Sequence, residues 1–296
     1  MFLKNVSIFI FVLLSFSVLA DETDSAKNKI ISNITNSIST GLENIIGGEG
    51  ATEVQLTAGQ DYHPEFSIMA VRPITLHPEV DAWFIQLQLN DTKIRGDERF
   101  SINTGVGYRK LSEDKSYFSG ANTFIDYDEE GNARASFGFE LRSSAFEAIA
   151  NYYTAISGAQ TVGAYTERAL DGIDVSIIGE LPYLPWANLI FNHYEWQADE
   201  GSSDSEGEKY SLELTLTPNF IVEAGGDDNT IDGYNRFVKA YFVFPGREKV
   251  AASTNFIGES AFSKGNMSSE LLSKVRRTNK IVIESAGSGV VMARGN

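Results

Sequence analysis

The stretch Tyr210-Ser-Leu-Glu-Leu-Thr-Leu-Thr217 alternates strictly between apolar and polar side chains. Its Tyr and three Leu residues occupy one set of positions, and Ser, Glu and the two Thr residues occupy the other. Successive side chains of a β-strand point to opposite faces, so this period of two predicts a strand with one apolar and one polar face. Leu214 would then lie on the apolar face and Thr215 on the polar face.

The same alternation recurs along most of the chain, for example in Ala135-Ser-Phe-Gly-Phe-Glu-Leu-Arg142. We predict about twelve such strands, at residues 54–62, 65–75, 82–92, 99–111, 115–127, 132–142, 144–154, 170–180, 186–198, 207–217, 219–229 and 233–244. Strands of about ten residues have the length that is needed to cross a bilayer at a tilt.

Two all-β architectures accommodate long alternating strands. In a soluble sandwich the apolar face forms the core, whereas in a membrane barrel it contacts lipid and the polar face lines the lumen. Small residues at polar-face positions, such as Gly105 and Gly107, suit a crowded lumen. Aromatic residues near strand ends, among them Tyr127, Tyr153 and Trp196, suit girdles at the membrane interfaces. We therefore predict an antiparallel transmembrane β-barrel of about twelve strands over residues 51–245.

Composition excludes several classes of function. The 296-residue chain has a formal net charge of −16, which argues against nucleic-acid binding because phosphate contacts need a basic surface. Cysteine is absent, so disulfides, zinc–thiolate sites and thiol catalysis are excluded. The sequence contains three histidines, His63, His77 and His193, and no string pairs one with a nucleophile. We expect no enzymatic activity, no cofactor and no metal site.

The N-terminus carries the features of an export signal. Residues 1–20 combine a basic residue, an apolar run and small residues at a cleavage point, as in a secretory signal peptide. The alternative is an uncleaved membrane anchor, but the apolar run is short and a polar stretch follows it. In residues 21–50, Ile30, Ile34 and Ile38 recur at helical spacing and predict a periplasmic amphipathic helix. The predicted location is the outer membrane of a Gram-negative bacterium, where the barrel contacts lipid.

Connection lengths predict the orientation of the barrel. Counted from a periplasmic N-terminus, the outer connections are the longer or more acidic ones, for example residues 155–169 and 199–206. The inner connections are short or proline-rich, for example Ser143 and Pro218. Short periplasmic and longer external connections are typical of outer-membrane barrels. An even number of strands would return the chain to the periplasm after Phe244.

Short motifs in a fixed order connect these strands to a known family. They include Gly105-Val-Gly-Tyr-Arg109, Asn122-Thr-Phe-Ile-Asp-Tyr-Asp128, Glu167-Arg-Ala169, Glu180-Leu-Pro182, Thr217-Pro218 and Asn279-Lys-Ile-Val-Ile-Glu284. In this order the chain resembles the β-domain of inverse autotransporters, the intimin and invasin family. The resemblance implies a twelve-stranded outer-membrane barrel that is inserted by the barrel-assembly machinery with the help of periplasmic chaperones.

The resemblance also assigns the region after the barrel, residues 246–296. It implies a pore helix at 268–275, an extended linker at 276–284 and a short tail. The linker's basic residues would pair with carboxylates that point into the lumen; the basic residues are Arg276, Arg277 and Lys280, and the candidate partners are Glu140, Glu213 and Glu223. In the family an adhesive passenger follows, whereas here twelve residues follow Glu284. We therefore expect a barrel without a passenger, whose surface or host partner is unknown.

A charged group at the end of the long connection is the strongest further candidate site. It consists of Glu167, Arg168, Asp171 and Asp174. These residues could fix a loop that folds into the lumen as a structural plug, or they could form ordinary exposed salt bridges, which contribute only about 0.2–1 kcal/mol each. The resemblance favours the plug. Acidic loop tips such as residues 126–130 could bind divalent cations weakly, but solvated loops are the simpler interpretation.

The predicted function is that of a translocator and anchor. The barrel would thread its own C-terminal segment to the cell surface, with a role related to adhesion by family resemblance. The alternative is a structural barrel or a narrow pore without a passenger, in which residues 268–284 are a vestigial plug.

Overall fold

The alternating segments form the strands that their period predicts. The structure is a computed structural model and describes residues 49–59, 64–198, 203–285 and 289–291. The predicted signal peptide and all but the last two residues of the predicted amphipathic helix lie outside the described residues. Among the residues that are described, no helix is long and apolar enough to cross a membrane.

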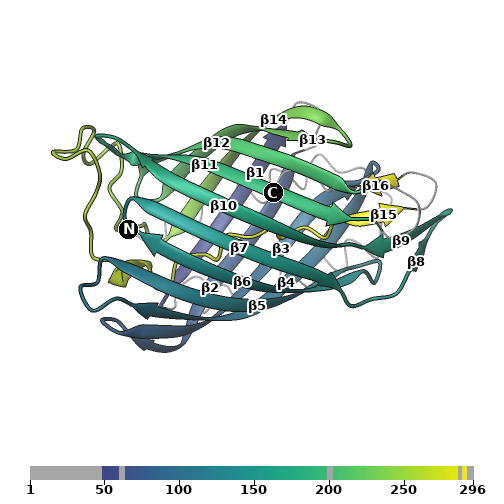
Figure 1. The fold of residues 1–296 in the computed structure, drawn as a ribbon, viewed down its shortest axis with the longest axis horizontal. Coiled ribbons are helices and arrows are strands. Elements are labelled where there is room, and N and C mark those ends of the chain that lie inside the picture. Colours follow the sequence, from purple (N-terminus) through teal and green to yellow (C-terminus); the bar gives the residue numbers. More distant parts are fainter. Residues whose placement is uncertain (1–48, 60–63, 199–202, 286–288, 292–296) are drawn as a thin grey trace, which may run out of the picture. The chain divides into compact units, whose positions relative to one another are not determined.

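In the described part of the chain, twelve antiparallel strands close into a barrel (Figure 1). They are β1 (Ala51–Gly59), β2 (Glu65–His77), β3 (Asp81–Ile94), β4 (Asp97–Leu111), β5 (Tyr117–Asp128), β6 (Ala133–Ser143), β7 (Phe146–Ala155), β10 (Asp171–Leu181), β11 (Leu184–Gln197), β12 (Ser205–Thr217), β13 (Phe220–Asn229) and β14 (Gly233–Phe244). Each pairs with its neighbour along the chain, β7 with β10, and β14 closes the ring by pairing with β1. The predicted fold class is confirmed.

The polar face of the strands points into the lumen. On β12, Glu213 and Thr215 are fully buried, while Leu214 between them is partly exposed. On β6 the outward rings of Phe137 and Phe139 are 47% and 57% exposed. An exposed apolar band around a barrel is the surface that contacts lipid. The outer wall of this barrel therefore suits a membrane and its inner wall suits polar contacts.

Two glycines leave space for aromatic rings inside the lumen. A Cβ atom on Gly105 would lie 2.3 Å from a ring atom of Phe124, and one on Gly107 would lie 2.3 Å from a ring atom of Phe84. Both rings belong to a buried cluster that contains Val275 of the C-terminal segment. The small inward residues thus make room for side chains that hold this segment.

The predicted aromatic girdle is wrong for two of its members. Tyr127 is 49% exposed on the outer wall, as a girdle residue should be. Tyr153 and Trp196 are buried in the lumen, with their ring centroids 5.1 Å apart. The position of a residue along its strand determines how near it lies to the membrane interface. Whether its side chain points to the lipid or into the lumen depends instead on the alternation. These two residues belong to the inward set.

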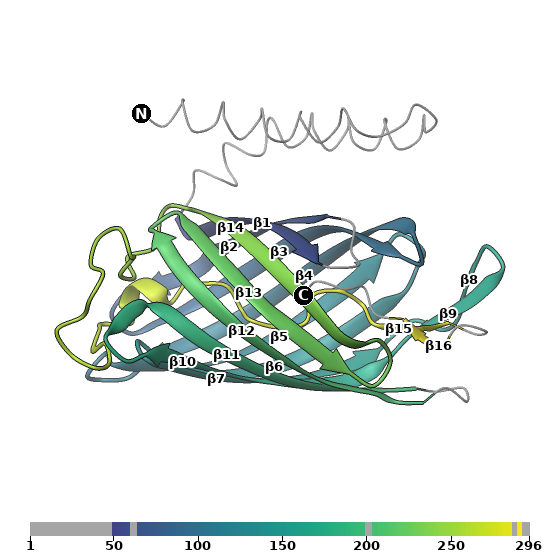
Figure 2. The same cartoon turned by 90° about the horizontal axis from the view of Figure 1, so that it is seen from above.

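The two ends of the barrel differ. We call the end at which β1 begins and β14 finishes the proximal end, and the opposite end the distal end. At the distal end β8 (Gln160–Val162) and β9 (Tyr165–Ala169) form a hairpin within the long connection (Figure 2). Strands β15 (Ile283–Ser285) and β16 (Gly289–Val291) of the C-terminal segment extend it into a sheet of order β16-β15-β9-β8.

At the proximal end, residues 245–267 form backbone hydrogen bonds with the ends of several strands and with the turns between them. Backbone amides donate to backbone carbonyls at 2.9 Å in three pairs: Ala252 to Thr215, Gly258 to Tyr183, and Met267 to Lys115. The connection therefore crosses from β12 to the β4–β5 turn before the chain enters the lumen.

The β4–β5 turn is held by Asp114. Its carboxylate accepts hydrogen bonds from the Ser112 hydroxyl at 2.7 Å and from the amide and hydroxyl of Ser116 at 3.1 and 2.8 Å. These bonds, chiefly the one from Ser112, keep the pKa of Asp114 below its usual range. The turn thus presents a fixed Lys115 carbonyl to Met267.

The expected pore helix is much shorter than the predicted 268–275. A 3-10 turn, η1 (Ser268–Glu270), begins it, and irregular backbone follows. An α-helix would need the Val275 amide to donate to the Leu271 carbonyl. Instead the Val275 amide donates to the Gln86 side chain at 2.8 Å, and the Leu271 carbonyl accepts from Arg109 at 2.9 Å. The barrel wall takes both partners that the helix would use.

Candidate functional site in the barrel lumen

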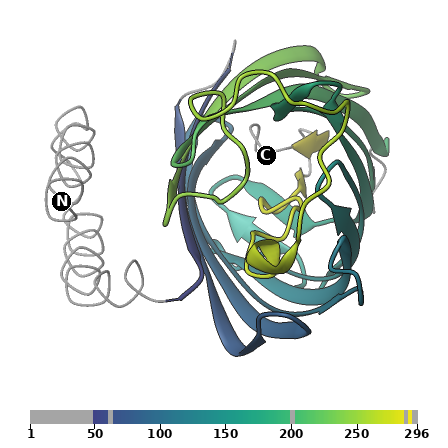
Figure 3. The same ribbon diagram turned by 90° about the vertical axis from the view of Figure 1, so that its left-hand side faces the viewer.

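Residues 271–285 run through the lumen from the proximal to the distal end, and we call them the threaded segment (Figures 2 and 3). At its proximal start, Leu271 is buried in a cluster that contains Phe118. At its distal end, Ile283 is buried in a cluster with Ile94 and forms part of β15. The lumen is therefore the candidate functional site, and its contacts with the threaded segment follow.

Arg276 joins the threaded segment to two carboxylates of the wall, on β7 and β12. Its guanidinium donates to both oxygens of Glu213 on β12, at 2.9 and 3.0 Å, and to Glu147 on β7 at 3.1 Å. A two-pronged contact of this kind is among the stronger ion pairs because both hydrogen bonds are charge-assisted. Glu213 is one of the carboxylates that the sequence analysis named for the linker.

Arg277 belongs to a buried cluster with Asp126 and Arg134. It donates to the two oxygens of Asp126 at 2.9 and 2.7 Å, and Arg134 donates to one of those oxygens at 3.0 and 2.8 Å. All three side chains are fully buried. The guanidinium carbon of Arg134 also lies 4.3 Å from the ring centroid of Tyr153. One carboxylate thus holds a cation of the wall and a cation of the threaded segment.

Lys280 pairs with Glu65 of β2, which also accepts a hydrogen bond from Thr92 at 2.5 Å. The other two carboxylates proposed for the linker are paired within the wall. Glu140 accepts from Arg109 at 2.6 Å, and Glu223 lies 3.4 Å from Lys239. The prediction is wrong for these two, because alternation gives the face of a carboxylate but not its height in the lumen.

Asp174 and Asp171 have different partners although they lie three residues apart. Asp174 points into the lumen, where it accepts hydrogen bonds from the Tyr153 hydroxyl at 2.5 Å and the Thr278 amide at 3.1 Å. Asp171 accepts a hydrogen bond from the Ala155 amide at 2.7 Å and so joins the two ends of the long connection. Asp174 therefore contacts the threaded segment, and Asp171 shapes the loop beside it.

Glu167 and Arg168 lie on β9, the strand that pairs with the end of the threaded segment. Arg168 is opposite Glu284 and Glu167 is opposite Ser285. The buried Glu167 carboxylate accepts hydrogen bonds from Arg99 at 2.9 and 3.2 Å, and also from Arg95, which donates to Ser285 as well. These side chains fasten the distal hairpin to both the barrel and the threaded segment.

Sequence reasoning missed the wall residues that bind the threaded segment most closely. Arg109 and Asp126 lie within the motifs that carry the family resemblance, but their roles are not visible in a strand pattern. The sequence did offer one signal: a charged residue at an inward-facing position of a strand is expected to be buried and therefore to need a partner. The pattern does not say which of many inward partners it takes.

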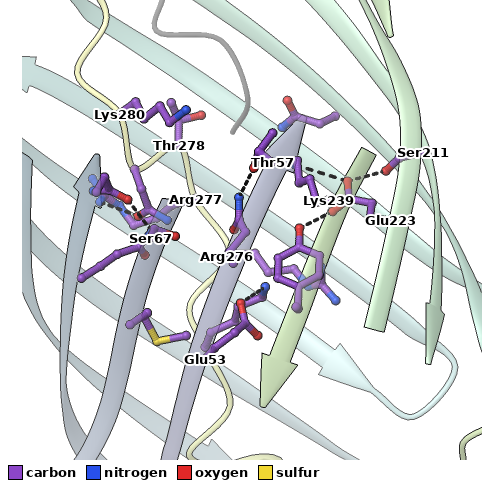
Figure 4. Close-up of a pocket in the computed structure, with 18 of the residues that line it drawn as sticks. Glu53, Thr57, Ser67, Ser211, Glu223, Lys239, Arg276, Arg277, Thr278 and Lys280 are labelled. Carbon is purple, nitrogen blue, oxygen red and sulfur yellow. Dashed lines mark hydrogen bonds and ion pairs between the residues drawn. The ribbon is translucent and has the colours of Figure 1, made fainter. Parts of the chain in front are cut away.

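A polar cavity of about 130 Å³ remains beside the threaded segment (Figure 4). It lies against the inner faces of β1–β3 and β10–β14, and its lining includes Glu53, Ser67, Ser211, Glu223 and Lys239. Both signs of charge line it. Lys274 of the threaded segment crosses to Glu53 at 2.6 Å, so side chains of that segment close part of this space.

The side chains of the lumen described above bind a polypeptide segment. Candidate metal ligands and histidines are considered next. In the part of the chain that the structure describes, no group of three or more His, Cys, Asp or Glu side chains is placed to hold a metal ion. His77 bonds Asp81 at 2.6 Å, and His193 lies within β11 opposite Glu208. His63 lies outside the described residues.

Comparisons with known proteins give one family and a fold. The family model for the inverse autotransporter β-domain matches residues 11–279. No curated protein matches the chain. A solved membrane-protein structure from work on the mechanism of in-meso crystallization is 22% identical with a TM-score of 0.65, and covers 80% of this chain and 99% of that chain. That likeness shows the barrel fold alone.

Two other solved barrels overlap less well. The KdgM porin in complex with disordered oligogalacturonate is 6% identical with a TM-score of 0.46, and covers 65% of this chain and 98% of the porin. Outer membrane phospholipase A from Escherichia coli is 8% identical with a TM-score of 0.42, and covers 67% of this chain and 91% of that enzyme. With scores this low, neither bears on the function of this chain.

Proposed function

Because this chain belongs to the inverse autotransporter β-domain family, we propose that it anchors its own C-terminal segment in the outer membrane and threads it to the cell surface. The protein is an outer-membrane β-barrel whose outer wall contacts lipid. One observation carries the proposal: residues 271–285 occupy the lumen along its length and end in a strand that pairs with the distal hairpin. We assign it no enzymatic activity.

The topology supports one direction of threading. Export through a cleaved signal peptide at residues 1–20 would deliver the chain to the periplasm, where chaperones and the barrel-assembly machinery would receive it. The chain enters the barrel at the start of β1 and leaves it at the end of β14, and both points lie at the proximal end. The proximal end would therefore face the periplasm, and the distal sheet would face outward. Whatever follows Ser285 would then be displayed on the outer surface. A role in adhesion is inferred from the family, with no partner identified.

The cavity of about 130 Å³ favours a second candidate function, a narrow pore. The ion pairs Lys274–Glu53 and Lys280–Glu65 cross from the threaded segment to the wall that lines the cavity. They should keep the lumen closed when the segment is in place. Planar-bilayer recordings discriminate between the two functions. Stable open-channel steps from the full chain would favour the pore, and their absence would favour the anchor.

A cysteine pair should report the threaded state directly. We expect Arg168→Cys with Glu284→Cys to form a disulfide in the folded protein, because the two residues are opposite each other on β9 and β15. Antiparallel partners have Cα atoms about 4.5–5.5 Å apart, which is within the range that a disulfide bridges. The chain has no other cysteine, so non-reducing electrophoresis after mild oxidation reads this bond alone.

The matched control is Arg168→Cys with Ser285→Cys. Ser285 is one residue along β15 and its side chain leaves the opposite face of the strand. We expect this pair to cross-link much less. Cross-linking of the two pairs to the same extent, or of neither, would argue against a segment that is docked on β9.

A further inference from the structure

One wall of the lumen binds the backbone of the threaded segment. Between Leu271 and Asn279, six carbonyls accept hydrogen bonds from wall side chains of β4, β6 and β7. The pairs are Arg109 with the carbonyls of Leu271 at 2.9 Å and Ser273 at 2.6 Å, Arg142 with Lys274 at 3.0 Å, Asn151 with Arg276 at 3.2 Å, Arg134 with Thr278 at 2.8 Å, and Asn103 with Asn279 at 2.7 Å.

Wall acceptors complete this set of backbone contacts. The Val275 amide donates to Gln86 at 2.8 Å, and the Thr278 amide donates to the Tyr153 hydroxyl at 2.8 Å. An extended chain away from water must find partners for its carbonyls and amides outside itself, because it has no internal ladder. The wall supplies these partners from β3, β4, β6 and β7.

Wall carboxylates hold the donors in position. Glu140 accepts from Arg109 at 2.6 Å and lies 2.9 Å from Arg142. Asp126 accepts from Asn103 at 2.7 Å and from Arg134 at 2.8 Å. In the same way Asp174 accepts from Asn151 at 2.8 Å. Each donor is therefore fixed by the barrel on one side and offers its remaining N–H groups to the lumen, whether or not a given residue lies opposite.

The opposite wall binds side chains of the segment, as Asp126 of β5 and Glu147 of β7 also do. From β1, β2 and β12, the contacts Glu53–Lys274, Glu65–Lys280 and Glu213–Arg276 all end on side chains of the threaded segment. The cavity lies on this side. Ion pairs of this kind recognise one sequence in one register. Carbonyls, by contrast, recur about every 3.3 Å along any extended chain.

We propose that the wall formed by Arg109, Arg142, Asn151, Arg134 and Asn103 is a binding site for extended polypeptide backbone of any sequence. This inference rests on the proposed function of threading. During export the wall would hold whichever residues occupy the lumen, and it would pass the chain from one set of donors to the next. The guanidinium groups suit this role because each offers several donors in a fixed fork. The side-chain ion pairs of the opposite wall would fix the final register.

The test compares two variants of the full chain, each with an epitope after Asn296. The backbone variant, Arg142→Met with Asn151→Leu, removes two carbonyl donors. It strands no carboxylate, because Glu140 keeps Arg109 and Asp174 keeps Tyr153. The side-chain variant neutralises both members of two ion pairs: Arg276→Met with Glu213→Gln, and Lys280→Met with Glu65→Gln. The measurement is the rate at which the epitope becomes labelled on intact cells, normalised to the fraction of barrel that shifts in mobility on boiling.

We expect the backbone variant to slow the appearance of the epitope by about tenfold, the order of effect expected for losing two hydrogen bonds, one of them charge-assisted. The side-chain variant should stay within about twofold of the parent chain, since its donors are intact. Slowing confined to the side-chain variant, or equal slowing in both, would overturn the inference while leaving threading itself intact. A parent chain whose epitope is never labelled would overturn threading and with it this inference.

Discussion

Replacing Ile177 with arginine is expected to destabilise the barrel by about 2–4 kcal/mol. Ile177 lies near the middle of β10, on the outer wall, and is 45% exposed. Its outward neighbours Ile173 and Val175 are 39% and 40% exposed, so this strand presents a continuous apolar band. A charged group near the bilayer midplane loses its water and gains no partner there. Equilibrium unfolding in lipid vesicles measures the change.

The control is the adjacent residue. Ser176 points into the lumen and lines the polar cavity together with Asp174. We expect Ser176→Arg to cost much less than Ile177→Arg, because a cation in that cavity meets water and carboxylates. Equal costs, or a larger cost for Ser176→Arg, would show that the two faces of β10 are assigned the wrong way round.

A second large loss is expected for Asp126→Leu. Two buried guanidinium groups, Arg134 and Arg277, share the Asp126 carboxylate, and all three side chains are fully buried. Removing one partner of a buried ion pair typically costs about 3–5 kcal/mol, because the remaining charge stays buried without compensation. The same unfolding assay in lipid vesicles reads this loss.

Two comparisons separate this effect from a general effect of mutation. Glu130→Leu changes an exposed carboxylate in the turn that follows β5, and it should cost little. Arg277→Met added to Asp126→Leu removes one of the two stranded cations, so the double variant should recover part of the loss. A double variant that is less stable than Asp126→Leu alone would contradict the cluster described above.

The strand pattern could be predicted because it is local. Burial of Glu213 and Thr215 on one face of β12 follows from a period of two and needs no knowledge of the neighbouring strands. Closure was predictable as well, since an even number of long strands in an exported chain leaves few alternatives. Alternation does not fix where a strand sits in the membrane, and Leu214 lies near the proximal end of β12.

The contacts across the lumen could not be predicted in the same way. The partners of Arg277 and Lys280 depend on the stagger of the strands around the barrel, which places Asp126 and Glu65, and not Glu140 or Glu223, beside them. The pore helix that the resemblance implied is short for a related reason: the wall binds backbone groups of residues 271–275 that the helix would use. The residue pattern of the C-terminal segment does not show which hydrogen-bond donors the barrel strands will place beside it.

In the proposed function, the C-terminal segment crosses the membrane through the lumen and leaves at the distal end. A small epitope added after Asn296, detected with an antibody that does not cross the outer membrane, reports where this segment ends. We predict that intact cells are labelled, and that permeabilising the outer membrane adds little. Labelling only after permeabilisation would place the tail in the periplasm, and the barrel would then be a pore or a scaffold with no exporting role.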